Sequence, residues 1–151
     1  MRCMQRRTDR TSVIFFCLFF LSTLVLDQAV KFVVQTYPEI TGTFFRLTEN
    51  SGIAFSIPFS NTLLLIILIV VLFFLSILCV QSIRRGDRME IVCYALLIGG
   101  GISNSMDRLR FGAVHDTFAL PGGLLFNFAD SAIVVGIFLL LWHKRFTPRQ
   151  S

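Results

Sequence analysis

Charged residues are scarce in this chain, and long apolar runs stand in their place. Asp, Glu, Lys and Arg make up 15% of the 151 residues, 54% are hydrophobic, and the mean hydropathy is +0.73. This balance excludes an ordinary soluble globular domain. The apolar runs are continuous rather than alternating, which favours a bundle of membrane-spanning helices over a β-barrel. The length allows one domain, predicted over residues 1–151.

Residue types that build metal sites and paired nucleophiles are also few. The 4 cysteines have no paired spacing for zinc, haem or a redox C-x-x-C motif, and neither H-E-x-x-H nor G-x-S-x-G occurs. His115 and His143 fall on opposite sides of the membrane in the topology described below. Neither a zinc centre nor a serine nucleophile with a paired histidine is therefore indicated.

Four apolar runs approach the length of a membrane span. A helix needs about 20 residues to cross about 30 Å of hydrocarbon, so the third run needs its flanks. Asp27, Gln28 and Lys31 interrupt the first run, and no small-x-small cleavage site follows it, so we predict an uncleaved span rather than a signal peptide. The predicted spans are about 13–34, 62–80, 91–106 and 124–142.

Basic residues predict the orientation of these spans. They gather in the N-terminal segment, after the second run and in the C-terminal tail, whereas the other two connections hold only Arg46, Arg108 and Arg110. By the positive-inside rule both termini are predicted to be cytoplasmic, and the loops at about 35–61 and 107–123 face outward. The net charge of +5 is thus a topology signal and not evidence for binding nucleic acid.

The two outward loops carry strand and turn signals. Alternation around Thr41–Phe45 and Ile53–Ile57 predicts a small strand pair on the membrane surface, and Pro121-Gly122-Gly123 is a turn signal. The predicted fold class is an all-α membrane protein with four transmembrane helices. The predicted fold also has a small extracytoplasmic β-rich platform, which the first outward loop forms.

Acidic residues gather at one membrane depth. Asp27, Asp107, Asp116 and Asp130 all lie within or close to an outward membrane end. A charge in a membrane span is costly unless it faces protein or water, so each is a candidate functional residue. Asp27 and Lys31 are four apart and share a helix face, either as a structural ion pair or as a contact to substrate.

Polar groups also cluster at the end of the third run. Asn104 and Arg108 project together, and Arg108 can pair with Asp107 or another carboxylate, or bind backbone carbonyls or lipid phosphates of a substrate. The preceding Gly99-Gly100-Gly101 predicts close packing against another helix.

Asp116 and Asp130 are the best candidates for acid–base chemistry. Two carboxylates that converge on one water repel each other, so one stays protonated while the other is ionised and takes a proton from the water. This is an aspartyl-protease arrangement. Two structural acids bound by Asn and Arg would have the same spacing.

Five ordered motifs resemble those of the bacterial lipoprotein signal peptidase (signal peptidase II) family. They span residues 27 to 130 and agree with the topology above. The motifs are Asp27-Gln28-Ala29-Val30-Lys31, Thr48-Glu49-Asn50-Ser51-Gly52-Ile53-Ala54-Phe55, Asn104-Ser105-Met106-Asp107-Arg108, Val114-His115-Asp116 and Phe126-Asn127-Phe128-Ala129-Asp130.

The resemblance implies an intramembrane aspartyl endopeptidase of the bacterial plasma (inner) membrane, with its active site near the outer face. Such enzymes cut diacylglyceryl-modified prolipoproteins before the lipidated cysteine, without metal or cofactor, and are targets of globomycin. Their partners are these substrates and membrane lipids, not nucleic acid. Asp116 and Asp130 would be catalytic. The implied binding and supporting residues are Asn50, Gly52, Asn104, Arg108, Asn127, Asp27, Lys31 and Asp107.

Three features depart from the family pattern. Ser103 stands where the family usually has glycine, Thr117 separates Asp116 from Phe118, and the link from Asp116 to Asp130 is short. Ser103 predicts a small packing change, and Thr117 predicts an altered local register. The short link predicts a smaller outward loop.

Two other functions are compatible with some of these residues. A small transporter or channel subunit would use membrane acids as an ion or proton relay, but a relay needs ionisable groups spaced through the bilayer, and here they crowd toward one face. A non-catalytic assembly or lipid-binding subunit would give Asp116 and Asp130 no reason to be paired.

Overall fold

Four helices and a small sheet make up the described part of the chain. The computed structural model describes residues 10–52 and 60–146. The elements in order are α1 (Arg10–Thr36), a short 3-10 helix (Pro38–Ile40), β1 (Phe45–Asn50), α2 (Asn61–Arg85), α3 (Arg88–Phe111), β2 (Val114–Ala119), β3 (Leu125–Phe126) and α4 (Phe128–Phe146).

Three of the helices, α1, α2 and α3, are long and apolar enough to cross a membrane. The 19 residues of α4 include three charged ones, Asp130, Lys144 and Arg145. The prediction of membrane-spanning helices is therefore confirmed for three spans. The fourth span and the cytoplasmic placement of both termini stay predictions.

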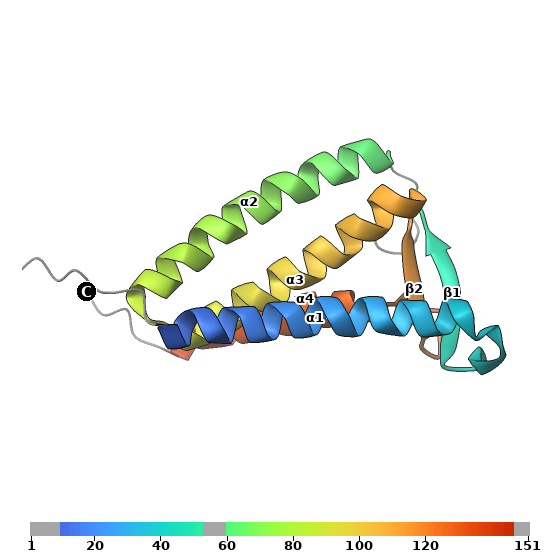
Figure 1. Cartoon of the computed structure of the whole chain (residues 1–151), viewed down its shortest axis with the longest axis horizontal. Helices are drawn as coiled ribbons and strands as arrows, with labels where there is room; N and C mark the ends of the chain where they lie inside the picture. Colours follow the sequence, from blue (N-terminus) through green and yellow to red (C-terminus); the bar gives the residue numbers. More distant parts are fainter. Residues whose placement is uncertain (1–9, 53–59, 147–151) are drawn as a thin grey trace, which may run out of the picture.

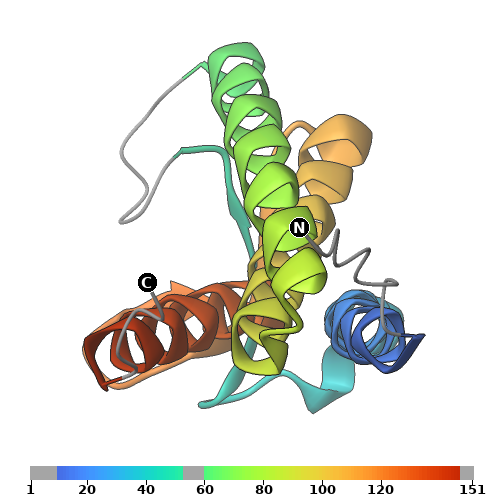
Figure 2. The same ribbon diagram turned by 90° about the vertical axis from the view of Figure 1, so that its left-hand side faces the viewer.

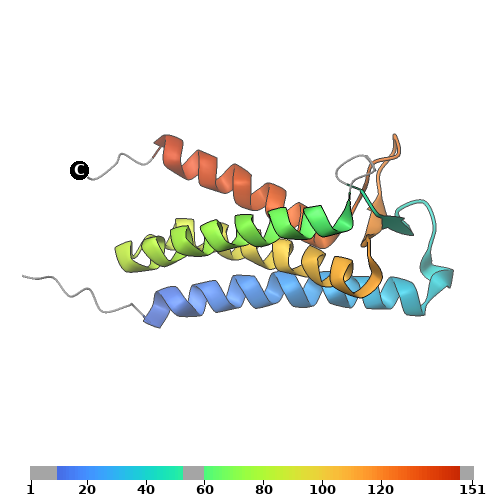
Figure 3. The same ribbon diagram turned by 90° about the horizontal axis from the view of Figure 1, so that it is seen from above.

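Helix α3 lies at the centre of the bundle. Figures 2 and 3 show α1 and α4 on opposite sides of it, with α2 along a third side. The core is formed by Cys79 of α2 with Tyr94, Leu97 and Ile98 of α3. Since α3 touches every other helix, a residue on it can face any of them.

The glycines of α3 allow this close approach. A Cβ on Gly100 would lie 2.6 Å from the Ala129 carbonyl oxygen, and one on Gly101 would lie 2.9 Å from Cδ2 of Leu72. The predicted packing role of Gly99-Gly100-Gly101 is confirmed. The backbone of α4 next to Asp130 therefore rests directly on α3.

Gly100→Ala is expected to lower the free energy of unfolding by about 1–3 kcal/mol, because the added methyl group pushes α4 away from α3. Thermal unfolding in detergent measures the loss. Gly42→Ala is the matched control, since nothing lies within 4 Å of a Cβ there. Equal melting temperatures for the two variants would contradict the close contact.

The sheet joins the two outward loops. It has three antiparallel strands in the order β1-β2-β3, with Thr48 opposite Asp116 and Phe118 opposite Phe126. In Figure 1, β1 and β2 stand at the end of the helices away from the α2–α3 turn. The sheet thus places residues of both loops over one end of the bundle.

The first predicted strand, around Thr41–Phe45, forms a few residues later, as β1, and its pairing within the first loop stays a prediction. Residues 45–50 pair with β2 from the second loop, because β2 follows α3 directly and lies beside them. The second predicted strand, 53–57, lies outside the described residues. The β1–β2 pairing is irregular opposite Thr117, because the register shifts between Phe45 and Thr48, while Phe118 still lies opposite Phe45 and Phe126.

Every helix end lies beyond the predicted span except the start of α4. α2 and α3 extend through charged residues to a tight turn, where Gly86 has a φ of 74° and the Asp87 side chain accepts the Glu90 N–H. The last run was predicted from residue 124, but α4 begins at Phe128 because Leu125–Phe126 pairs with β2.

Candidate active site

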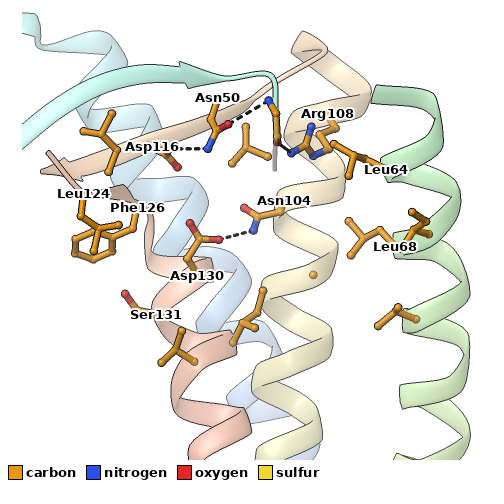
Figure 4. A pocket seen from close by; sticks show the side chains of 18 of the residues that line it. Asn50, Leu64, Leu68, Asn104, Arg108, Asp116, Leu124, Phe126, Asp130 and Ser131 are labelled. Atoms are coloured by element: carbon orange, nitrogen blue, oxygen red, sulfur yellow. Dashed lines mark hydrogen bonds between the residues drawn. The ribbon is translucent and has the colours of Figure 1, made fainter. Parts of the chain in front are cut away.

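Asp116 and Asp130 line one cavity at the sheet end of the bundle. The cavity has a volume of about 720 Å³, and Asn50, Asn104 and Arg108 also line it. Figure 4 shows these side chains arriving from β1, β2, α3 and α4. The structure therefore brings together two acids that the chain separates by a strand and a turn.

Asp116 is held in β2 with 2% of its surface exposed. Its Oδ2 accepts the Asn50 side-chain amide at 3.2 Å, from the neighbouring strand. The pKa of Asp116 is raised to about 6, mainly by burial and next by the charge of Asp130, while the Asn50 hydrogen bond and Lys31 oppose the rise. A carboxyl with this pKa holds a proton more readily than an ordinary aspartate does.

Asp130 forms a reciprocal cap at the start of α4. The Asn127 Oδ1 accepts the Asp130 N–H at 2.8 Å, and Asp130 Oδ2 accepts the Asn127 N–H at 3.3 Å. This is a capping box, which satisfies two backbone donors that a helix leaves unpaired at its N-terminus. The other oxygen, Oδ1, accepts the Asn104 side-chain amide at 2.8 Å.

Asn127 connects the two acids. The residue is fully buried, and its Nδ2 lies 3.1 Å from Asn104 Oδ1 and 3.5 Å from Asp116 Oδ1. Its backbone meanwhile bonds to Asp130. Asn127 thus caps α4 with its side chain and contacts both carboxylates, that of Asp116 through its side-chain amide and that of Asp130 through its backbone N–H.

Arg108 is engaged by backbone and amide groups. Its Nη2 donates to the Gly52 carbonyl at 2.6 Å, and its Nη1 donates to Asn61 Oδ1 at 3.3 Å. The Gly52 N–H in turn donates to Asn50 Oδ1 at 3.1 Å. Of the partners considered from sequence, Arg108 therefore binds a carbonyl, here one of the protein's own, and it joins the ends of β1 and α2.

Asp27, Lys31 and Asp107 form a buried ion network outside the cavity lining. Lys31 Nζ lies 2.5 Å from Asp27 Oδ2 and 2.8 Å from Asp107 Oδ2. Of the two roles considered for the Asp27–Lys31 pair, the geometry matches a structural ion pair. The second partner, Asp107, was not evident from sequence because it comes from α3.

Several contributors were missed by sequence reasoning. Asn61 holds Arg108, and the hydroxyl of Ser103 donates to Asp27 Oδ2 at 2.6 Å. Ser103 is therefore part of the ion network and not only a packing change. Gln28 lies in the first motif, one residue after Asp27, and its amide donates to both Ser103 and Asp107. A polar residue in an apolar run was the available signal for each.

The rest of the cavity is apolar. Leu64, Ile67, Leu68 and Val71 of α2 line one side, and Ile133, Val134 and Val135 of α4 line another. The cavity thus has a polar end at the two acids and an apolar body between helices. Within residues 10–52 and 60–146, no group of three His, Cys, Asp or Glu side chains is arranged to hold a metal ion.

Comparison with known proteins decides the family. The family model described as signal peptidase (SPase) II matches residues 19–146. The chain belongs to the signal peptidase II family. It is therefore an aspartic peptidase that removes signal peptides from prolipoproteins, and the transporter or channel alternative is not favoured.

Relatives within the signal peptidase II family cover most of the chain. The lipoprotein signal peptidase of Moorella thermoacetica is 35% identical over 136 residues, covering 84% of this chain and 90% of the relative. The lipoprotein signal peptidase of Halothermothrix orenii is 36% identical over 136 residues, which cover 82% of this chain and 92% of the relative.

A solved structure has the same fold. It is described as a bacterial membrane enzyme determined by the in meso method at 2.3 Å resolution. It aligns with a TM-score of 0.72 at 24% identity and covers 93% of each chain. At this identity the likeness supports the fold alone.

Proposed function

We propose that this signal peptidase II is an intramembrane endopeptidase that cuts diacylglyceryl-modified prolipoproteins before the lipidated cysteine, with Asp116 and Asp130 as its catalytic pair. The observation that carries the proposal is the shared cavity. Both carboxylates line its polar end, and Asn127 lies in contact with each.

The two carboxylates divide the proton transfers of hydrolysis. The ionised member takes a proton from water as the water oxygen attacks the scissile carbonyl carbon, and the protonated member donates its proton to the carbonyl oxygen. The tetrahedral intermediate then collapses, the carbon–nitrogen bond breaks, and the leaving amine of the cysteine takes a proton from the pair. The raised pKa of Asp116 supports a proton held within the pair.

The apolar body of the cavity suits the acyl chains of the substrate. Leu64 and Leu68 of α2 face Ile133 and Val134 of α4 across it. The lipid attached to the cysteine would lie between these helices while the peptide reaches the acids. The side-chain amides of Asn50 and Asn104, which bond to the two acids, would orient the carboxylates for the peptide.

We also propose a membrane arrangement for this chain. We place α4 as a fourth span, both termini in the cytoplasm and the active site near the outer face of the plasma (inner) membrane. Arg84, Arg85 and Arg145 support this orientation, because they lie at helix ends opposite the sheet, and basic residues favour the cytoplasmic side. A globomycin-type inhibitor would occupy the cavity in place of substrate.

A lipid-dependent cleavage assay tests the proposal. We expect the purified chain to cut a peptide whose cysteine carries a diacylglyceryl group at least about 100 times faster than the same peptide with an unmodified cysteine, because buried acyl chains contribute binding energy. Globomycin should abolish the faster reaction. Equal rates for the two peptides, or cleavage that ignores the inhibitor, would contradict the proposed substrate.

A further inference from the structure

A buried ion triad lies beside the active site without lining it. Lys31 of α1 contacts Asp27 on its own helix and Asp107 on α3, at 2.5 Å and 2.8 Å. The three residues are at most 3% exposed. None of them contributes to the cavity lining. Any effect of the triad on the reaction therefore passes through other residues.

Each carboxylate of the triad holds the backbone next to an active-site acid. Asp27 Oδ1 accepts the N–H of Ala129 at 2.9 Å, and Asp107 Oδ2 accepts the N–H of His115 at 3.1 Å. Ala129 directly precedes Asp130, and His115 directly precedes Asp116. The Ala129 N–H lies in the first turn of α4, where a helix offers no acceptor of its own. The two acids are thus anchored by equivalent contacts on different elements.

A second link joins the same two carboxylates. Ser103 donates to Asp27 Oδ2 at 2.6 Å and accepts the Gln28 amide at 2.9 Å. The same amide lies 3.1 Å from Asp107 Oδ1. Ser103 is fully buried and stands where the family motif usually has glycine, so this hydroxyl adds a hydrogen bond that a glycine would not make.

The positive charge of Lys31 holds the two carboxylates together. Two buried anions repel each other, and a cation in contact with both removes that repulsion. Without it, the two carboxylates would move apart, and one backbone N–H would lose its acceptor. The groups that act on Asp116 are Asp130, Asn50, Lys31, Asp107, Asn127 and Arg108. Of these, Lys31 lowers the pKa of Asp116.

We propose that Lys31 is a positioning residue that couples the two active-site aspartates, by holding Asp27 against the start of α4 and Asp107 against β2. This inference rests on the proposed catalytic role of Asp116 and Asp130. Lys31 touches no substrate; it fixes the distance between the elements that carry the two acids.

The test compares Lys31→Met with Lys144→Met in the purified full-length chain, using the diacylated peptide. Lys144 is exposed near the end of α4, so its variant removes the same charge far from the site. We expect Lys31→Met to lower kcat by about 100-fold while KM changes less than about threefold. Its pH–rate profile should move to higher pH, because the lost charge no longer lowers the pKa of Asp116. Lys144→Met should match the wild type in all three measurements.

A rescue separates coupling from simple loss of folding. Asp27→Asn keeps an oxygen acceptor for Ala129 and removes the unpaired anion, so the double variant Asp27→Asn/Lys31→Met should recover at least about tenfold in kcat over Lys31→Met alone. If Lys31→Met does not fold, Ser103→Ala carries the test, with kcat expected to fall about threefold at unchanged KM.

Three results would overturn the inference. The first is that folded Lys31→Met keeps the wild-type kcat and pH profile. The second is that the losses in kcat from Asp27→Asn and Lys31→Met simply add in the double variant. The third is that Ser103→Ala keeps the wild-type kcat. An inactive wild-type chain in the same assay would instead refute the proposed substrate, so the two failures are distinguishable.

Discussion

Asp116→Asn and Asp130→Asn are each expected to lower kcat on a diacylated peptide by at least about a thousandfold, since each removes one partner of the proton transfers. Both side chains keep their size and an oxygen acceptor, so the fold should persist. Glu49→Gln is the matched control. It removes a carboxylate from the same sheet, where the Glu49 side chain is 75% exposed and lines no part of the cavity. Wild-type rates in either aspartate variant would refute the assignment.

The same substitution at Asp116 should raise stability at neutral pH. Burial and Asp130 raise the pKa of Asp116 from 3.8 to about 6 in the folded chain. Because the folded pKa lies above the unfolded one, the group costs stability as pH rises through this interval, and the full cost remains above it. Asp116→Asn should therefore raise the free energy of unfolding by about 1–3 kcal/mol at pH above 7.

Thermal unfolding across the pH range measures this effect. The advantage of Asp116→Asn over the wild type should shrink as pH falls toward the ordinary range of an aspartate, where both are neutral. A variant that is inactive and less stable at every pH would indicate a structural acid, the alternative that the sequence left open.

Loss of the Asn127 side chain is expected to produce the second largest effect. Asn127→Ala removes the cap of α4 and the contacts to Asn104 and Asp116, so kcat should fall by about 100-fold or more and stability by about 1 kcal/mol. Asn127→Ser is the informative partner variant, because serine is also a good N-cap. It should retain the stability but lose the activity.

Urea or thermal unfolding and peptide cleavage, measured on the same preparations, separate the two roles of Asn127. If Asn127→Ser regained wild-type activity, the residue would act only as a helix cap. If both variants kept full activity, Asn127 would have no part in joining the acids.

The sequence predicted local features of the site well because their causes are local. Asp130 was predicted near the start of the last run, and the structure places it in the first turn of α4, although the capping box with Asn127 was not predicted. The Asp27 to Lys31 pair lies on one face of α1 because the two residues are four apart. The packing role of Gly100 also follows from its lack of a side chain.

Contacts between distant segments could not be predicted from the sequence. The β1–β2 pairing depends on where α3 ends relative to the first loop, and spacing within that loop suggested a different partner. Arg108 had several possible partners, and only the fold places Gly52 and Asn61 beside it. The charge of Asp107 indicated a partner but not that Lys31, on another helix, would be that partner.

Asp116 and Asp130 are expected to titrate as one pair in the active site. Infrared titration of carboxyl groups tests it directly, with the Asp116→Asn spectrum subtracted to isolate Asp116. We expect wild-type Asp116 to stay protonated well above pH 4, and we expect Asp130→Asn to lower the pKa of Asp116, because the neighbouring negative charge is gone. An Asp116 titration that is the same with and without the Asp130 carboxylate would contradict it.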